Sequence, residues 1–250
     1  MSGKRAATQY DVKLAKQYNS ESIHEHPQNF LPYATLLKRV GSIVGQEVLD
    51  LACGGGFGSR LLAERGARVT AADISPDMIA DGVAREKAKP LGIKYLVRDA
   101  AALDLGRTFN TLTAMYLFNY GFPEKNLDQL VGATARHLTP GGQLFALTTP
   151  AQPLVPMVPN ASHWTEWIDK PMQEGSRLRL HILGIDGKEV CNFKIHWWSH
   201  GLYEKILKKH GFTKIGWWRP TATPELRASF ANWIELERHN CSALLTATKR

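Results

Sequence analysis

One stretch decides the fold of this 250-residue chain: Val48-Leu49-Asp50-Leu51-Ala52-Cys53-Gly54-Gly55-Gly56-Phe57-Gly58. Residues 48–51 are typical of a short buried strand, the glycines favour a turn, and 57–65 predict a helix with leucines on its inner side. Glycine is needed in such a turn because a side chain would keep the backbone away from a ligand. The stretch therefore predicts the first strand, loop and helix of a nucleotide-binding α/β unit.

A carboxylate follows this unit at the spacing expected for ribose binding. A second strand is predicted over 67–72 and ends at Asp73, about 20 residues after the first loop glycine, where a carboxylate can accept hydrogen bonds from ribose hydroxyls. The glycines at 54, 56 and 58 depart from the dinucleotide pattern G-x-G-x-x-G, since Ser59 or Arg60 would stand where its third glycine packs. The glycine loop and Asp73 together indicate an adenosine cofactor, and the spacing of the glycines argues against a dinucleotide.

These residues carry a family resemblance. Residues 50–56, Asp-Leu-Ala-Cys-Gly-Gly-Gly, resemble the D-x-G-x-G-x-G signature of class I S-adenosylmethionine-dependent methyltransferases, with Ala52 in place of the first glycine. Residues 138–142 look like the family's turn before the fifth strand, and the resemblance covers about 10–143. It implies S-adenosylmethionine as cofactor, S-adenosylhomocysteine as product, and an α/β Rossmann-like fold. That fold has a seven-stranded, mostly parallel sheet with an antiparallel last strand and helices on both faces. In this chain a β-hairpin lid is expected in addition, as an insertion after the fifth strand.

The resemblance also implies the cofactor-binding residues. Asp73 would hold the ribose, Ile74 and Met78 would line the adenine slot, and Asp99 would accept from the adenine amino group. Tyr10, Leu14 and Tyr18 lie on one helical face, which is either a core-facing stripe or, by resemblance, a lid helix whose tyrosine reaches the cofactor or the substrate. The full expected set is Tyr10, Tyr18, Ala52, Cys53, Gly54, Gly56, Asp73, Ile74, Met78, Asp99, Ala100, Ala101 and Tyr116.

The acceptor side is predicted from a strand end and from an insertion. A fourth strand over 109–118 leads to Asn119 and Tyr120, and ligands of open α/β sheets bind at carboxyl ends of strands; a helix cap and a core aromatic are the alternatives. Asp186-Gly187 predicts a hairpin of 177–185 and 188–198, interpreted as a substrate lid or as a dimer or packing surface. Side chains of its second strand should alternate, with Cys191, Phe193, Ile195 and Trp197 on one face and Asn192, Lys194, His196 and Trp198 on the other. The expected substrate-binding residues are Asn119, Tyr120, His163, Trp164 and Trp198, and the candidate bases are His181, His196 and His163, each of which has a structural or surface role as its alternative.

Composition narrows the function classes. The net charge of +8 is spread along the chain, so it favours no nucleic-acid partner and leaves an anionic small substrate open. Without an apolar run near ~18 residues or an apolar signal core, the chain is expected to be cytoplasmic. The three cysteines, Cys53, Cys191 and Cys241, have neither metal nor disulfide spacing, and no metal is expected.

Four segments are expected: an N-terminal helical lid (1–40), a cofactor-binding core (41–149), an inserted substrate lid (150–198) and a C-terminal completion of the sheet (199–250). The expected activity is methyl transfer to a nitrogen or oxygen of a small, aromatic or heterocyclic metabolite, by a monomer or homodimer. Trp197-Trp198-Ser199 ahead of Tyr203-Glu204 looks like natural-product enzymes of secondary metabolism, such as the toxoflavin N-methyltransferase group. An RNA or protein methyltransferase and a non-catalytic binding module are the alternatives.

Overall fold

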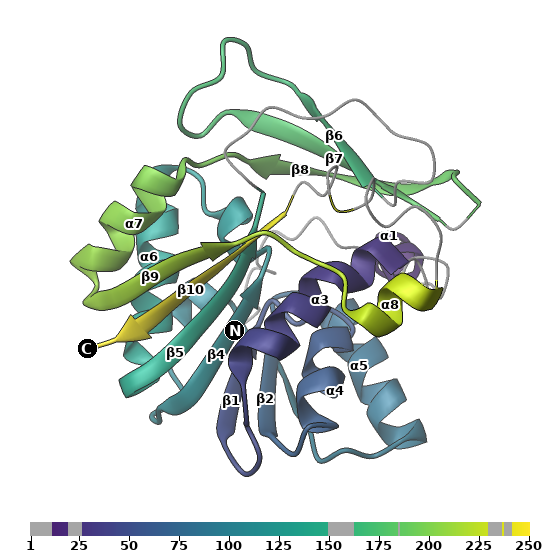
Figure 1. Ribbon diagram of the computed structural model, residues 1–250, viewed down its shortest axis with the longest axis vertical. Helices are drawn as coiled ribbons and strands as arrows, with labels where there is room; N and C mark the ends of the chain where they lie inside the picture. The colour runs from purple at the N-terminus through teal and green to yellow at the C-terminus, as the bar shows by residue number, and fades with distance from the viewer. Residues whose placement is uncertain (1–11, 20–26, 150–162, 185, 230–236, 238–241) are drawn as a thin grey trace, which may run out of the picture.

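A seven-stranded sheet forms the body of the protein (Figure 1). The computed structural model describes residues 12–19, 27–149, 163–184, 186–229, 237 and 242–250. The strand order is β3-β2-β1-β4-β5-β10-β9; the first five are parallel, and β10 runs antiparallel to both of its neighbours. The expected mostly parallel sheet with an antiparallel last strand is confirmed. The strands are β1 (Glu47–Leu51), β2 (Arg68–Asp73), β3 (Lys94–Val97), β4 (Phe109–Met115), β5 (Leu138–Thr148), β9 (Phe212–Trp218) and β10 (Ala243–Lys249).

Helices cover both faces of this sheet, because the buried strands are apolar on both sides. On one face Val48, Val69 and Leu244 pack with α3 and α4; on the other, Leu49 and Leu112 pack with α6 and α7. Figure 1 shows α6 and α7 on the side opposite α3, α4 and α5. The helices are α1 (Val12–Tyr18), α3 (Pro27–Val40), α4 (Phe57–Ala63), α5 (Pro76–Ala88), α6 (Glu124–Arg136), α7 (His200–Lys209) and α8 (Pro224–Ser229), with short 3-10 turns η1 (Ala100–Ala102) and η2 (Leu117–Tyr120).

Two of the boundaries that differ from the sequence prediction follow from local backbone features. The fourth strand ends at Met115 because Tyr116 has φ 61°, which turns the chain into η2. The fifth strand begins at Leu138, which already pairs with Phe109, and the ladder shifts register before Thr111. The predicted turn at 138–142 is therefore an irregularity within β5.

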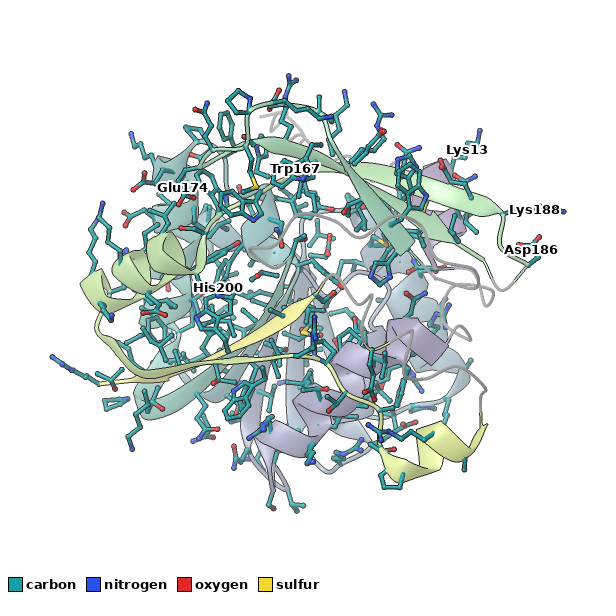
Figure 2. All side chains as sticks on the ribbon, turned by 45° about the horizontal axis from the view of Figure 1, so that its top comes forward. Lys13, Trp167, Glu174, Asp186, Lys188 and His200 are labelled. Carbon is teal, nitrogen blue, oxygen red and sulfur yellow. The ribbon has the colours of Figure 1, made fainter. Side chains whose placement is uncertain are left out.

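A second, three-stranded antiparallel sheet lies over the carboxyl ends of the parallel strands (Figure 1). It consists of β6 (His163–Trp167), β7 (Arg177–Leu183) and β8 (Glu189–His196) in that order, and β8 contacts both α1 and η2. The predicted hairpin is β7 and β8, whereas β6 was not predicted. Figure 2 shows Asp186 and Lys188 at the hairpin tip, pointing away from the body. We call β6–β8 the lid sheet.

The inner face of the lid sheet is apolar and faces the body of the protein. Leu178 and Ile182 of β7 form a cluster with Phe193 and Ile195 of β8, against which Tyr18 of α1 packs. As predicted, alternate residues of β8 from Cys191 to Trp197 are buried on this face. None of the described helices combines the length and apolar character needed to cross a membrane.

Candidate active site

A cavity of about 130 Å³ lies between the large sheet and the lid sheet. Its floor comes from the carboxyl ends of β1, β2 and β4, and its roof from the lid sheet. Parallel α/β sheets bind ligands at this edge. The cofactor half is lined by Ala52–Gly55, Asp73 and Met78, together with Asn19, which directly follows α1. The lid half is lined by Tyr18, Tyr120, His163, Leu180, Ile182, Phe193 and Ile195.

The glycine loop has a backbone that few side chains tolerate. Gly54 and Gly56 have φ 54° and 84°, and Ala52 adopts φ 55° although it carries a Cβ. A Cβ on Gly55 would lie 2.7 Å from the Asn19 amide, and one on Gly56 only 2.1 Å from the Tyr95 hydroxyl. The loop therefore makes a close-fitting cradle of bare backbone.

Asp73 holds the loop in place from the end of β2. One carboxylate oxygen accepts from the Gly54 amide at 2.9 Å and the other from the Ser75 amide at 2.8 Å. Burial raises the pKa of the Asp73 carboxyl, and these amide hydrogen bonds oppose that rise. The carboxylate lines the cavity, as predicted for a ribose-binding group.

Asp50 lies buried beneath the loop. Its oxygens accept from the Ser59 hydroxyl at 2.5 Å and from the Thr113 hydroxyl at 2.6 Å. Burial raises the pKa of Asp50 to about 6, and the two hydroxyl groups oppose this rise. Hydroxyl donors without a neighbouring cation do not fully compensate for the burial of a charge.

The end of α1 closes the cofactor half from above. The Asn19 amide nitrogen lies 3.2 Å from the Met78 sulfur, and Arg85 of α5 donates to the Asn19 carbonyl at 2.9 Å. Tyr18 packs edge-on against Phe193, with ring centroids 5.5 Å apart. The predicted leading helix thus contacts the loop and the lid sheet together, although Tyr10 lies outside the described residues.

Part of the predicted adenine side is placed elsewhere. Met78 and Cys53 line the cavity, whereas Ile74, Asp99 and the small residues after it do not. Asp99 is exposed and caps η1 by accepting from the Ala101 amide at 2.9 Å, with Ala100 between them. The Tyr95 hydroxyl is buried next to Gly56. It has no hydrogen-bond partner among the described residues.

Only two of the five predicted substrate-binding residues reach the cavity: Tyr120 and His163. Asn119 is fully buried and donates to the His196 carbonyl at 3.1 Å, so it ties η2 to β8. Trp198 packs in the main core. Trp164 lies on the outer face of the lid sheet, because strand residues alternate and its neighbour His163 faces inward.

The two histidines predicted as bases also lie on the outer face. His181 stacks on Trp164 with centroids 3.9 Å apart, and its Nδ1 lies 2.6 Å from a Glu189 oxygen. His196 stacks on Phe122, and its Nδ1 lies 2.9 Å from the Gly175 carbonyl. The predicted alternation of β8 was right, but its apolar face, rather than the face with His196, lines the cavity.

Some lining residues were not predicted. Asn19 reaches the cavity from the turn after α1, and Asn29 and Tyr33 reach it from α3. The Tyr33 ring packs edge-on against Phe57, with ring centroids 4.9 Å apart. The glycine at position 58 is the one sequence feature that fits the position of Tyr33, since a Cβ there would lie 3.0 Å from the Tyr33 ring. Tyr116, which was predicted, lines the cavity with its hydroxyl hydrogen-bonded to Ser242.

These residues fit an adenosyl cofactor. The bare backbone of Gly54 and Gly55 admits close approach, a buried carboxylate stands at the end of β2, and Met78 offers an apolar, polarisable surface beside them. Gly56, which was predicted to bind the cofactor, faces Tyr95 instead and is not among the lining residues. Among the described residues, no group of three or more histidine, cysteine, aspartate or glutamate side chains is arranged to hold a metal ion. The fit therefore favours a nucleoside ligand.

Sequence comparisons point the same way. A family model described as a methyltransferase domain matches residues 48–142. A ubiquinone biosynthesis O-methyltransferase of Xylella fastidiosa is 32% identical over 181 residues, which cover 65% of this chain and 71% of the relative. The Pseudomonas entomophila enzyme of the same name is 25% identical over 183 residues, covering 68% and 73%.

Solved structures share the fold. An S-adenosylmethionine-dependent methyltransferase of Clostridium acetobutylicum superposes with a TM-score of 0.63 at 16% identity, covering 95% of this chain and 98% of the other. Magnesium protoporphyrin IX methyltransferase of Synechocystis, solved with bound S-adenosylmethionine, gives 0.59 at 16% identity, covering 95% and 90%. Together with the Xylella relative and the glycine cradle, they lead to one conclusion: the chain belongs to the class I S-adenosylmethionine-dependent methyltransferases.

Proposed function

We propose that this methyltransferase acts on an oxygen or nitrogen of a small, flat, uncharged aromatic or heterocyclic metabolite. One observation carries the proposal: the lid half of the cavity is lined by aromatic and aliphatic side chains. Among the described lining residues, Asp73 is the one carboxylate, it belongs to the cofactor half, and no lysine or arginine is present. An apolar slot with few polar groups suits a flat, neutral acceptor better than an anion.

When bound, S-adenosylmethionine supplies a methyl group that is already activated by its positive sulfur. The chain's own residues then have to bind, orient and shield the acceptor. Tyr18, Phe193 and Ile195 offer the surfaces that would hold an aromatic ring. Such positioning can supply about 7 kcal/mol or more of a reaction barrier, and the lid sheet would keep water from the reacting groups.

The relatives support a small substrate, since two of them are named for ubiquinone biosynthesis. A role in natural-product metabolism, of the kind found in the toxoflavin N-methyltransferase group, is part of the same proposal. So is the four-segment organisation with boundaries at 40, 149 and 198.

A screen tests the acceptor class. The purified protein is incubated with S-adenosylmethionine and with phenols, hydroquinones and nitrogen heterocycles, and S-adenosylhomocysteine formation is measured. RNA and protein substrates form the comparison arm. Turnover of the small aromatics is expected, while turnover of RNA or protein alone would contradict the proposal. A thermal-shift assay with S-adenosylhomocysteine and with NAD, where only the former should stabilise, checks that the preparation is competent.

Two variants localise the acceptor. Phe193→Ala removes a lining ring from the inner face of β8, and Asn192→Ala changes its outward-facing neighbour. We expect the KM of an active aromatic acceptor to rise about tenfold in the first variant, which corresponds to a loss of about 1.4 kcal/mol of binding, and to stay unchanged in the second. Equal effects would place the acceptor outside the lid half.

A further inference from the structure

We propose that His163 is the general base that takes the proton from the methyl acceptor, so that the acceptor presents an O–H or N–H group rather than an unprotonated ring nitrogen. This inference rests on the proposed function, because it concerns the acceptor half of the same cavity. Two observations support it: the lid sheet places His163 in the cavity, and the other ionisable lining groups are poorly suited to accept a proton.

The lid sheet directs His163 into the cavity. It is the first residue of β6 and pairs with Ile182, which in turn pairs with Cys191 of β8. All three side chains are buried, His163 at 6% exposure, and His163 and Ile182 line the cavity. Because strand residues alternate, the register that buries Ile182 also fixes the imidazole on the inner face.

The other ionisable groups that line the cavity are poor proton acceptors. Burial raises the pKa of the Tyr18 and Tyr33 hydroxyls and of the Cys53 thiol, so these groups keep their protons. The Tyr116 hydroxyl is hydrogen-bonded to Ser242. Tyr120, the remaining tyrosine of the lining, also carries a protonated phenol group, which is a weak base. The neutral imidazole of His163, by contrast, carries a ring nitrogen with a lone pair that can accept a proton.

Asp73, the remaining ionisable group of the lining, belongs to the cofactor half. Both of its oxygens already accept from backbone amides of the glycine loop and of the start of α5. Removing it would disturb the cradle itself. Among the described lining residues, His163 is therefore the one that can accept a proton without disturbing the hydrogen bonds that Asp73 makes to Gly54 and Ser75.

The proton of the acceptor's O–H or N–H passes to a ring nitrogen of His163, and the electron pair left on the acceptor forms the bond to the methyl carbon. The electron pair of the carbon–sulfur bond stays on sulfur, so the product S-adenosylhomocysteine is a neutral thioether. After product release the imidazolium returns its proton to water, and no oxidant or metal is needed.

The first experiment uses 4-nitrophenol, whose phenolate absorbs at longer wavelength than the phenol. It is titrated with pH on the wild-type complex with S-adenosylhomocysteine, on His163→Gln and on His163→Asn. In the wild type the bound phenol should ionise at a lower pH than in either variant, because an imidazolium stabilises the phenolate. His181→Asn, which changes a histidine on the outer face of the same sheet, should titrate like the wild type.

The second experiment compares acceptors of different acidity. With phenol, His163→Gln should lower kcat/KM on the order of 100-fold or more, with little change in KM. With 4-nitrophenol the loss should shrink, and it should vanish at a pH where that acceptor is ionised in solution. S-adenosylhomocysteine should still raise the melting temperature of each variant, which shows that the fold and the cofactor half are intact.

Equal losses of kcat/KM for both phenols, or the same titration of bound 4-nitrophenol in wild type and both variants, would overturn the proposal. So would a preference of the wild type for acceptors whose nucleophile carries no proton. Absence of turnover with every small aromatic would instead refute the proposed function. The titration does not depend on turnover and would still decide the role of His163.

Discussion

The two halves of the cavity obtain their shape from different parts of the chain. In the cofactor half the backbone is the wall: the chain has positive φ at Ala52, Gly54 and Gly56, and a Cβ on Gly56 would collide with Tyr95. In the lid half side chains are the wall: those on the inner face of ordinary antiparallel strands, together with Tyr18 of α1 and Tyr120 of η2. The cofactor half should therefore reject almost any added atom, whereas the lid half can change its lining without changing its backbone.

The strongest test of this contrast adds one carbon to the loop. Gly56→Ala combines φ 84° with a Cβ placed 2.1 Å from the Tyr95 hydroxyl. We expect the free energy of unfolding to fall by about 4 kcal/mol, from backbone strain and overpacking together, and the stabilisation by S-adenosylhomocysteine to disappear. Gly92→Ala is the matched control, since φ is 81° but no atom lies within 4 Å. Its loss should be about 1–2 kcal/mol, and an equal loss in both would contradict the steric argument.

The pH dependence of stability tests the buried carboxylate beneath the loop. The pKa of Asp50 is about 6 in the folded protein, above its ordinary value of 3.8. The folded state then binds the proton more tightly than the unfolded chain, so the contribution of Asp50 is fully present below about pH 4 and is lost as pH rises through 6. This loss is about 3 kcal/mol.

Urea unfolding of the wild type and of Asp50→Asn, from below pH 4 to above pH 6, measures this loss. The asparagine oxygen can accept from one of the Ser59 and Thr113 hydroxyls and its amide nitrogen can donate to the other, so it is a conservative control. Relative to Asp50→Asn, the wild type should lose unfolding free energy as pH rises from about 4 through 6, and the difference between the two curves should be constant above that range. Parallel curves would mean that Asp50 is ionised throughout.

Asp73 and Asp99, both predicted to bind the cofactor, should contribute unequally to S-adenosylhomocysteine affinity. Asp73→Asn should weaken S-adenosylhomocysteine binding about 30-fold, or about 2 kcal/mol, because it removes the charge from a buried hydrogen-bonding group of the cavity. Asp99→Asn should change the Kd less than threefold, a difference of about 0.6 kcal/mol, because Asp99 is exposed and caps η1. Calorimetry gives both values, and similar losses would show that cofactor binding rearranges the Asp99 loop.

The cofactor half was largely predictable from sequence because its requirements are local. Positive φ and close approach select glycine, a carboxylate follows at the end of the next strand, and Ser75 and Pro76 begin the helix after it. These signals lie within about thirty residues of one another, as one βαβ unit requires. Long-range packing is not needed to recognise them.

The lid half was predictable only in part. The Asp186-Gly187 turn and the alternation of β8 gave two strands correctly, but alternation alone does not say which face lines a cavity. His181 and His196 were therefore assigned to the wrong side. β6 went unpredicted because it is only five residues long and follows a proline-rich stretch, and its partner β7 begins ten residues after it ends.

Asn119 tests how the lid is held to the core. Asn119→Ala removes the hydrogen bond from η2 to the His196 carbonyl, and because the site is fully buried we expect a loss of about 1.5 kcal/mol in unfolding free energy. Hydrogen exchange of β8 should quicken. Asn126→Ala is the control: its side chain donates to the Phe122 carbonyl at an exposed position, so about 0.5 kcal/mol is expected. A rise in the KM of the acceptor without loss of stability would return Asn119 to the substrate site.

The smallest expected effect concerns the one residue of the loop that departs from the family signature. Ala52 carries a Cβ at φ 55°, which costs about 1–2 kcal/mol, while glycine would lose about 0.4–1 kcal/mol through the greater freedom of the unfolded chain. Ala52→Gly should therefore stabilise the protein by about 1 kcal/mol and leave the cofactor half intact. Ala71→Gly, in the buried middle of β2, should destabilise by a similar amount, since glycine weakens a strand interior. If Ala52→Gly destabilised as well, the left-handed backbone at this position would not be a source of strain, and the wall of the cofactor half would depend on the alanine methyl group as much as on the backbone.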